Sequence, residues 1–347
     1  MSVRPQVAVC VTHYELGGQR TVLNEQTRLL SDSYDITIVT EEQRIEAPPW
    51  CRLLIAPPWK SRLDPRPVRK TQNLLGAFDL VHCHESFAYI WEAAKNSRPL
   101  VVTSHGNCPA KYRKELSSKL EYWASEPLYG LAYRKADAVF GISRYVQRWL
   151  AKRYGVDALL CPNGVNLGAY SVGPEPRERA FLYVGELSER KGVPALVDGF
   201  RRARKVDPSL NLWLVGQGPL MEPLGRLPAE EKVCLFGSAA PETLSSLYAR
   251  CMAFITASYW EGFCLPILEA FASGTPVAAR DAYAMSELLR SPLAGIKFRN
   301  DCDIKDAILL LASRSEVDRE MLREEAEKYP WELGARVIRD VYARLLA

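Results

Sequence analysis

The chain has 347 residues, of which 48% are hydrophobic and 25% are charged, with a formal net charge of +4. This length exceeds what a single hydrophobic core usually supports, so the sequence predicts two domains. The hydrophobic fraction excludes an intrinsically disordered chain, and no apolar run approaches the length needed to span a bilayer. The N-terminus shows no charged leader before an apolar core, and the run 7–11 is too short to be one.

Cysteine usage and charge distribution narrow the class further. The nine cysteines form no Cys-x-x-Cys pair and no metal-ligand spacing, and several lie in apolar runs. This pattern predicts reduced, buried thiols in a cytoplasmic protein. Residues 111–153 hold ten Lys and Arg against four Asp and Glu, and residues 60–70 hold five against one. Such a basic first half fits an anionic membrane surface or a phosphorylated acceptor, and an ordinary solvated helix face fits it equally well.

The first half of the chain alternates short apolar runs with helical patterns, which is typical of βαβ units and a parallel sheet. The predicted strands are 7–11, 36–40, 53–56, 80–83, 100–103, 138–141 and 158–161. After the first strand comes a turn with Gly17 and Gly18, followed by a helix through residue 30. Paired glycines let the backbone approach a ligand and aim a helix N-terminus at an anion, although a plain tight turn has the same pattern. The turn is not a Gly-x-Gly-x-x-Gly fingerprint, so a dinucleotide site is not predicted.

All the histidines of the chain fall at the ends of predicted strands or in the loops just after them. They are His13, His82, His84 and His105. The carboxyl ends of parallel strands share one edge of a sheet, where ligands bind in open α/β folds. A lone histidine is more often structural, but four at one edge favour a polar site that a subset of them lines.

The first half ends with a basic, aromatic segment and a short run that leads into the linker between the two predicted domains. Residues 112–133 mix Lys and Arg with aromatic side chains, and two interpretations stay open: an interfacial amphipathic helix, or a core helix with a basic outer face. The run Cys161-Pro162-Asn163-Gly164-Val165-Asn166 ends the first domain. Residues 168–179, rich in Gly, Pro and charge, are the predicted linker.

The second half repeats the alternation, with strands predicted over 181–184, 212–216, 233–236, 253–256, 276–279 and 295–298. The first strand is followed by the loop Gly185-Glu186-Leu187-Ser188-Glu189-Arg190-Lys191-Gly192. The helix behind that loop places apolar residues at i, i+3, i+4 and i+7 on one face, which predicts a core helix.

The stretch 258–274, SYWEGFCLPILEAFASG, carries the strongest signal in the chain. Glu261 lies in a turn after a buried strand, a helix opens with Pro266 in its first turn, and Glu269 lies inside that helix. Two carboxylates at the carboxyl end of a parallel strand, together with the amides of 262–265 at the helix start, suit a polyhydroxylated ligand that carries an anionic group. For an isolated Glu, a solvated surface position would be the ordinary interpretation.

One acidic motif is interpreted as structural. Asp301-Cys302-Asp303 has the spelling of the Asp-x-Asp that holds a divalent ion in metal-dependent transferases. It follows the last predicted strand and precedes a helix, so we interpret it as a loop and N-cap acid.

These segments together resemble the retaining glycosyltransferases of family 4. The signature of that family matches Ser258, Glu261-Gly262-Phe263, Pro266, Glu269-Ala270 and Gly274-Thr275-Pro276-Val277. The Gly17-Gly18 turn, His105, Pro162-Asn163-Gly164-Val165 and Lys191-Gly192 match further family segments. Cys264 stands where the family usually has Gly, and Glu186 stands where the family has an Arg that helps to hold the donor diphosphate.

The resemblance implies an α/β protein of the GT-B fold, with two Rossmann-like domains whose parallel sheets face an interdomain cleft. Residues 1–165, together with a C-terminal crossing helix at 331–347, would form the acceptor-binding domain. Residues 166–330 would form the nucleotide-sugar donor-binding domain.

The resemblance also implies an enzyme that moves a hexose from a UDP- or GDP-sugar to a glycan or lipid-linked acceptor, with retention and without a metal or other cofactor. Catalysis would fall to Glu261, His105 and Lys191, and the acceptor would contact His13, Tyr14 and His84. The donor-binding residues would be Gly17, Gly18, Arg190, Ala239, Gly262, Phe263, Cys264, Leu265 and Glu269. Contact with the inner face of an anionic membrane stays open, and nucleic acid is not an expected partner.

Two other functions remain compatible with the sequence. The first is a degenerate protein that binds a nucleotide-sugar or a partner without turnover, because the acid Glu186 would repel a diphosphate. The second is a GT-B epimerase that interconverts sugar nucleotides without an acceptor.

Overall fold

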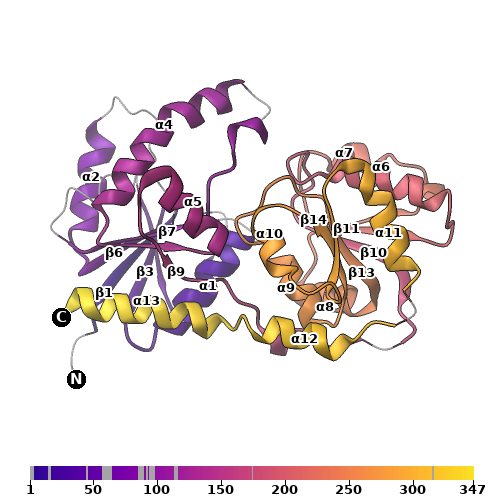
Figure 1. The fold of residues 1–347 in the computed structure, drawn as a ribbon. Coiled ribbons are helices and arrows are strands. Elements are labelled where there is room, and N and C mark those ends of the chain that lie inside the picture. Colours follow the sequence, from indigo (N-terminus) through magenta and orange to yellow (C-terminus); the bar gives the residue numbers. More distant parts are fainter. Residues whose placement is uncertain are drawn as a thin grey trace. The chain divides into compact units, whose positions relative to one another are not determined.

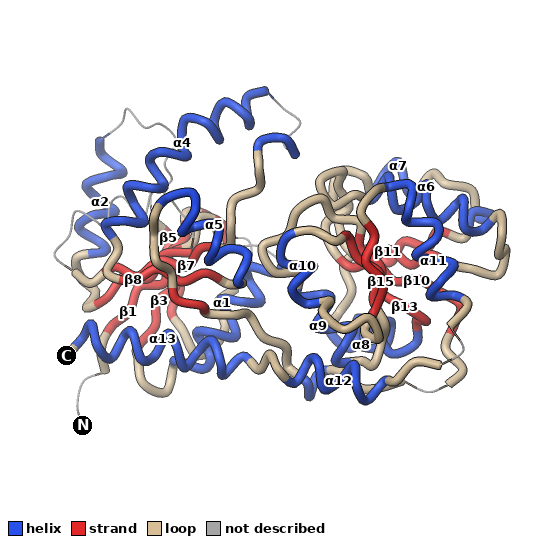
Figure 2. The backbone as a smooth tube through the Cα atoms, viewed as in Figure 1, coloured by secondary structure: helices blue, strands red, loops and turns tan. Residues whose placement is uncertain are grey.

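The computed structural model describes residues 4–14, 17–43, 46–56, 65–84, 90, 93, 98–112, 116–173, 175–314 and 316–347, with the backbone alone for 13, 42, 43, 65–69, 116–122, 124 and 125. The chain forms two compact units, each built around its own sheet (Figures 1 and 2). The first unit spans Met1–Ala110, Lys114–Asn163 and Trp331–Ala347, and the second spans Lys111–Arg113 and Gly164–Pro330.

The first unit contains a parallel sheet in the order β5-β3-β1-β6-β7-β8-β9. Its strands are β1 (Gln6–Cys10), β3 (Asp35–Thr40), β5 (Arg52–Ile55), β6 (Leu80–His84), β7 (Leu100–Ser104), β8 (Ala138–Gly141) and β9 (Leu159–Leu160). All seven predicted strands are therefore present. The strand order reverses between β1 and β6, and in open parallel sheets ligands bind at the carboxyl ends of strands beside such a reversal.

The helices of the first unit are α1 (Gly18–Leu30), α2 (Pro65–Leu75), α4 (Leu116–Lys135), α5 (Arg144–Tyr154) and α13 (Trp331–Leu346). Helix α1 packs beside α13, and α4 packs beside α5, with the two pairs on opposite sides of the sheet (Figure 1). Local sequence sets the ends of α5: the Ser143 hydroxyl accepts a hydrogen bond from the Val146 amide at 3.1 Å, and Gly155 ends the helix at a φ of 65°. A two-residue strand pair, β2 (His13–Tyr14) with β4 (Glu42–Gln43), was not predicted because neither half has an apolar run.

The second unit contains a parallel sheet in the order β12-β11-β10-β13-β14-β15. Its strands are β10 (Glu178–Val184), β11 (Asn211–Val215), β12 (Val233–Gly237), β13 (Cys251–Thr256), β14 (Val277–Arg280) and β15 (Gly295–Phe298). Its helices are α6 (Val193–Arg204), α7 (Met221–Gly225), α8 (Pro241–Arg250), α9 (Leu265–Ala272), α10 (Tyr283–Leu288), α11 (Ile304–Ala312) and α12 (Arg319–Glu327). The order of this sheet reverses between β10 and β13, so the loops after these two strands occupy the ligand-binding edge.

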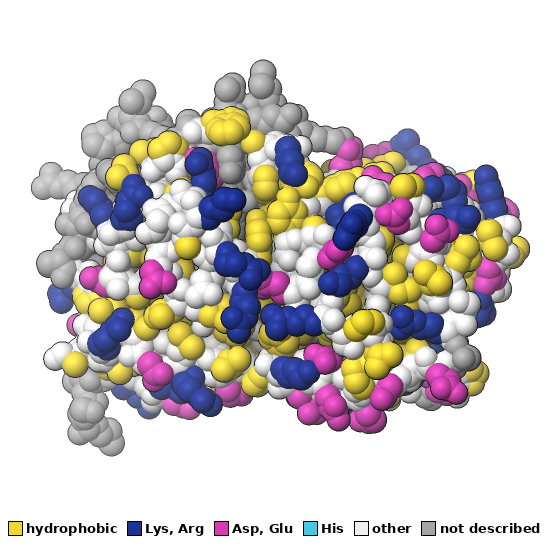
Figure 3. Space-filling model, in the orientation of Figure 1, with side chains coloured by type: hydrophobic (Ala, Val, Ile, Leu, Met, Phe, Trp, Pro, Cys, Tyr) yellow, Lys and Arg dark blue, Asp and Glu magenta, His cyan; other side chains and the backbone are white. Residues whose placement is uncertain are grey.

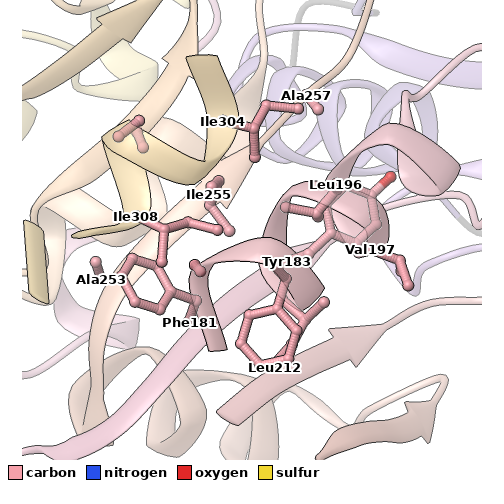
Figure 4. Close-up of a cluster of buried hydrophobic side chains, with 14 of the residues drawn as sticks. Phe181, Tyr183, Leu196, Val197, Leu212, Ala253, Ile255, Ala257, Ile304 and Ile308 are labelled. Carbon is pink, nitrogen blue, oxygen red and sulfur yellow. The ribbon is translucent and has the colours of Figure 1, made fainter. Parts of the chain in front are cut away.

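The core of the second unit lies between its sheet and the pair α6 and α11. Strand residues Phe181 and Ile255 meet Leu196 of α6 and Ile304 of α11, all with no exposed surface (Figure 4). Helices α9 and α12 pack against each other on the other side of the sheet (Figure 1). This two-sided burial explains why the strands read as nearly continuous apolar runs.

The predicted linker 168–179 is too long, because strand β10 already begins at Glu178. Arg177, just before that strand, is buried to 2% exposure. Its guanidinium donates to the carbonyls of Tyr248 at 3.2 Å and of Ser273 at 2.7 Å. Charge in this segment therefore fixes the start of the second sheet, where the sequence pattern indicated a solvated connection.

The basic segment 112–133 lies mostly in α4. Within the described part of that helix, Ala132 and Tyr133 are buried, whereas Trp123 is 63% exposed and Leu131 is 45% exposed. Lys and Arg side chains lie among apolar ones over the visible face of the molecule (Figure 3). In the parts of the chain that the structure describes, no helix combines the length and the apolar character needed to cross a membrane.

Candidate functional site

In the second unit, the loop between β13 and α9 carries Glu261 and leads into an uncapped helix. The Ser258 hydroxyl donates to the Trp260 carbonyl at 3.1 Å and so fixes the start of this loop. Cys264 is the N-cap of α9 at a φ of 79° and provides no side-chain hydrogen bond to the first turn. The N-terminal amides of α9 and its dipole therefore remain available to an anionic group.

Glu261 is paired with a cation from the neighbouring loop. Its carboxylate accepts a hydrogen bond from the Lys191 ammonium at 2.6 Å, and the two side chains are 14% and 19% exposed. Gly192 sets this approach, because a Cβ atom there would lie 2.1 Å from the carbonyl oxygen of Ala257. The loop after β10 and the loop after β13 thus touch backbone to backbone, and this contact brings together two of the residues expected to act in catalysis.

The unexpected acid Glu186 has its own partners in the loop after β10. Its carboxylate lies 3.1 Å from the Arg190 guanidinium and accepts a hydrogen bond from the Ser188 hydroxyl at 3.0 Å. The charge of Glu186 is therefore offset locally, and Arg190 is held at the same edge of the sheet as Lys191.

Glu269, on α9, lies in a different electrostatic environment from Glu261. Its partly buried carboxylate accepts a hydrogen bond from the Tyr248 hydroxyl at 2.8 Å. Burial raises its pKa, and hydrogen bonds from Tyr248 and Tyr170 oppose that rise. The sequence did not single out either tyrosine, because each lies far from Glu269 in the chain and neither belongs to a recognisable motif.

The other residues expected to bind a donor in this unit lie in or beside the loops that follow its strands. Phe263 is buried with its ring against Tyr329, and Leu265 starts α9. Gly262 is buried in the loop before α9, so its contribution to a ligand would come from the backbone. Ala239 lies between β12 and α8 and is partly exposed.

In the first unit, the Gly17-Gly18 turn follows β1. Gly17 is the N-cap of α1 at a φ of 141°, and a Cβ atom there would meet nothing within 4 Å. Gly17 is exposed and has no side-chain cap, so the first amides of α1 are open to a ligand. His13 lies in β2, but its side chain is outside the described part of the structure.

The expectation that Tyr14 contacts an acceptor is wrong for the side chain as it lies in this structure. Tyr14 has no exposed surface and belongs to the hydrophobic core of the first unit. Its hydroxyl donates to Asn24 of α1, and the Arg20 guanidinium lies 5.4 Å from the centre of its ring. Tyr14 therefore fixes the start of α1.

Three histidines lie together at the ends of β6 and β7, and two of them, His82 and His84, are buried. His82 Nδ1 lies 2.7 Å from the Tyr342 hydroxyl, and its Nε2 lies 2.7 Å from the Thr103 hydroxyl. His84 Nδ1 lies 3.1 Å from His105 Nε2. Burial lowers the pKa of His82 to about 3 and of His105 to about 4, and lowers that of His84 still more clearly. At neutral pH all three rings are therefore uncharged.

Burial also corrects the role expected of His84. His84 is only 2% exposed and lies behind His105, whereas His105 is partly exposed. His84 therefore offers almost no surface of its own to an acceptor, and its ring contacts that of His105.

The Asp-x-Asp motif participates in local structure. The Asp301 carboxylate accepts a hydrogen bond from the Tyr259 hydroxyl at 2.8 Å and pairs with Arg280. Asp303 accepts a hydrogen bond from the Asn300 amide at 2.9 Å and completes a capping box. Asp303 therefore serves the turn that leads into α11, and Asp301 links that turn to Tyr259 and Arg280 from the segments that follow β13 and end β14.

The fold and the positions of these residues define a class of protein. The family model "Glycosyltransferase Family 4" matches residues 16–169, and "Glycosyl transferases group 1" matches residues 171–329. The two models together cover nearly the whole chain. The chain belongs to this glycosyltransferase family, has the GT-B fold and is an enzyme of the glycosyltransferase class.

Relatives and solved structures agree with this assignment. A phosphatidyl-myo-inositol mannosyltransferase from Mycobacterium leprae is 28% identical over 289 residues, which are 77% of this chain and 74% of that protein. The sucrose-phosphate synthase of Thermosynechococcus elongatus has a TM-score of 0.83 at 20% identity, with 99% of both chains covered. The Anabaena HepE protein, solved in complex with UDP and glucose, has a TM-score of 0.79 at 18% identity, with 98% of this chain and 100% of that chain covered.

Proposed function

We propose that this glycosyltransferase moves a hexose from a nucleotide-diphosphate sugar to a glycan or lipid-linked acceptor, with retention of anomeric configuration and without a metal. The donor binds the second unit and the acceptor binds the first. The observation that carries this proposal is the Lys191–Glu261 ion pair of 2.6 Å beside the uncapped start of α9.

The residues beside that pair divide the recognition of a nucleotide-sugar among them. Lys191 and the amides at the start of α9 supply positive potential for the diphosphate, and they stabilise the charge that develops on it as the sugar leaves. Glu261 accepts hydrogen bonds from sugar hydroxyls. Glu269 accepts hydrogen bonds from the ribose, because a carboxylate without a cationic partner binds neutral hydroxyl donors well.

The first unit would supply the acceptor side and one contact to the donor sugar. His105 is partly exposed and uncharged, so it can donate or accept one hydrogen bond without adding charge. The open amides at Gly17 and Gly18 add a second site for negative charge. The exposed Trp123 and the basic residues of α5 support a lipid-linked acceptor at a negatively charged membrane surface.

Retention and metal independence follow from the resemblance to family 4. The proposed reaction occurs on one face of the sugar, with the leaving phosphate helping to deprotonate the acceptor. Glu261 forms a close ion pair with Lys191, which supports a role in holding hydroxyls and argues against an enzyme nucleophile.

The test begins with thermal shifts for UDP, GDP, ADP and their common sugar adducts in the presence of EDTA. A ligand at a hundredfold excess over its dissociation constant stabilises the folded state by about 2.7 kcal/mol. We expect one nucleotide to raise the melting temperature, and Lys191→Met to abolish that rise. Glu222→Gln, an exposed change in the same unit, serves as the matched control.

Transfer is then measured with the donor so identified and a panel of polyprenyl-phosphate, inositol-lipid and oligosaccharide acceptors. NMR of the product reports the anomeric configuration. Donor consumption that needs no acceptor, with a new sugar nucleotide as product, would replace the proposal with an epimerase. Binding without any consumption would replace it with a degenerate binding protein. The pairing of Glu186 with Arg190 weakens the latter alternative, because that acid is not left facing the diphosphate uncompensated.

A further inference from the structure

Glu269 differs from the other carboxylates of the site in having neutral partners. The Tyr248 hydroxyl donates to its Oε2 atom at 2.8 Å, and the Tyr170 hydroxyl makes a second hydrogen bond to the carboxylate. Among the described residues, the ion pairs of the second unit do not include Glu269, although they do include Glu261. Glu269 is thus a partly buried carboxylate that two tyrosines hold and no cation neutralises.

Both tyrosines are themselves fixed. The two rings meet edge to face, with centroids 5.9 Å apart. The backbone carbonyl of Tyr248 accepts hydrogen bonds from Thr275 at 2.7 Å and from Arg177 at 3.2 Å. The carbonyl of Tyr170 accepts one from Arg323 at 3.1 Å. These contacts tie three separate segments of the chain around one carboxylate.

The protonation state of the tyrosines makes them permanent donors. Burial raises the pKa of Tyr248 well above its ordinary value, and burial followed by the charge of Glu269 does the same for Tyr170. A carboxylate accepts about four hydrogen bonds, so two tyrosine hydroxyls leave about two positions open. Two neighbouring hydroxyl groups on one ring fill that remaining capacity without bringing a charge into the site.

We propose that Tyr248 and Tyr170 are positioning residues that aim the Glu269 carboxylate at the two ribose hydroxyls of the donor, so that the enzyme selects ribonucleotides over 2′-deoxyribonucleotides. This inference rests on the proposed donor site. It adds an explanation of how the enzyme distinguishes ribose from 2′-deoxyribose in the nucleotide, through residues that do not touch the donor themselves.

The test compares dissociation constants for UDP, GDP and ADP with those for their 2′-deoxy counterparts, by isothermal titration calorimetry. Hydrogen bonds to a charged group favour the ribonucleotide by about 10- to 100-fold in the wild type. We expect Tyr248→Phe to reduce this ratio at least about threefold, because the phenylalanine ring keeps the packing and loses only the donor. Tyr170→Phe is expected to act in the same direction, and Glu269→Ala is expected to bring the ratio near one.

A control separates positioning from a general loss of structure. Tyr34→Phe makes the same chemical change at a buried tyrosine of the first unit, where the ring packs edge to face on Tyr342 at 5.2 Å. Its ratio is expected to match the wild type. Far-ultraviolet circular dichroism and thermal unfolding establish that each variant is folded.

The outcomes separate this inference from the proposed function. If Tyr248→Phe and Tyr170→Phe weaken both forms of the nucleotide by the same factor, the tyrosines are merely structural and the inference fails. If the wild type binds a nucleotide but shows no preference for the ribo form, Glu269 does not read the ribose and the inference fails while donor binding stands. If the wild type binds none of the nucleotides, the donor site itself is refuted and the inference falls with it.

Discussion

Gly192 offers a direct test of the contact that brings the two loops of the proposed donor site together. Its φ is 68°, and a Cβ atom there would lie 2.1 Å from the Ala257 carbonyl oxygen and 2.7 Å from the carbonyl carbon. Both of these are backbone atoms at the end of β13. The Ala257 carbonyl also accepts hydrogen bonds from the buried Arg280 guanidinium at 3.2 and 3.3 Å, so it is not free to retreat. The substitution Gly192→Ala must therefore displace the loop after β10.

A second glycine of the same unit separates backbone strain from this close approach. Gly237 has a φ of 64°, but a Cβ atom there would meet only the side-chain ends of Gln217 at 3.2 Å and Met221 at 3.9 Å. Gly237→Ala is expected to cost about 1–2 kcal/mol, the ordinary penalty of a left-handed alanine. Gly192→Ala carries the same penalty plus a backbone overlap of more than an ångström, and we expect at least about 3 kcal/mol in total.

The assay is differential scanning calorimetry of both variants, with and without the nucleotide that binds the wild type. For a unit of this size, 1 kcal/mol corresponds to about 2–4 °C, so Gly192→Ala should lower the transition of the second unit by about 6 °C or more. The displaced loop also carries Lys191, so the nucleotide should no longer raise the melting temperature of Gly192→Ala. The nucleotide should still raise the melting temperature of Gly237→Ala. Equal destabilisation of the two variants, or a nucleotide shift retained in Gly192→Ala, would refute the argument that this contact builds the donor site.

Three further outcomes follow from particular contacts. Lys191→Met removes the cation that Glu261 pairs with at 2.6 Å, so the affinity for a nucleoside diphosphate should fall at least about tenfold in calorimetric titration. Arg190→Met removes a more exposed cation and should have a smaller effect, and a larger loss of affinity in Arg190→Met than in Lys191→Met would contradict the role proposed for Lys191. Tyr342→Phe leaves His82 Nδ1 without its hydroxyl partner at 2.7 Å and should cost about 1–3 kcal/mol in urea unfolding of the first unit, with no change in nucleotide affinity. Burial lowers the pKa of His82 from 6.5 to about 3, so between pH 6.5 and pH 3 the unfolded chain binds a proton on this ring that the folded chain does not bind. The free energy of unfolding that depends on His82 is therefore fully present above pH 6.5 and should fall by about 2 kcal/mol on acidification to about pH 5. Burial also lowers the pKa of His84 and of His105, so urea titrations at both pH values should show a loss of at least this size, and a first unit equally stable at both would contradict the prediction.

The sequence predicted the architecture well because parallel strands buried on both faces leave a strong signal. All the long strands of both sheets were predicted, and most boundaries agree within two residues, as for β8 and β15. The helix start at Pro266 was also predicted, because proline in the first turn is a local feature. Strand β10 begins earlier than predicted, since Glu178 is a strand residue without apolar character.

The side-chain environments of the site could not be predicted in the same way, because burial depends on the whole fold. Tyr14 and His84 were expected to contact the acceptor, yet both side chains are buried. The partners of Glu269 lie 21 and about a hundred positions away in the chain, and no periodic pattern connects them. Position along the chain indicated which edge of the sheet holds the site, but the hydrogen-bond partners required the coordinates.

The two departures from the family pattern are compensated differently. Glu186 brings an acid to the loop, and Arg190 at i+4 together with Ser188 offsets it. Cys264 occupies a left-handed conformation that favours glycine, which costs about 1–2 kcal/mol. Its side chain is buried, so packing offsets part of that cost. The loop after β10 therefore keeps a positive charge at Arg190 in place of the Arg that the family has at position 186, and the left-handed turn before α9 is kept with Cys264 in place of Gly.

The two glutamates of the proposed donor site have different electrostatic surroundings, and this difference supports different roles for them. Glu261 has its charge balanced by Lys191, so it can hold hydroxyls next to an anionic diphosphate without repelling it. Glu269 has neutral tyrosine partners and a raised pKa, and its carboxylate keeps capacity to accept further hydrogen bonds from neutral hydroxyl groups. Exchanging these surroundings would place an uncompensated acid beside the diphosphate and a neutralised one beside the ribose. The observed surroundings of the two carboxylates therefore support the roles proposed for them, with Glu261 beside the diphosphate and sugar and Glu269 beside the ribose.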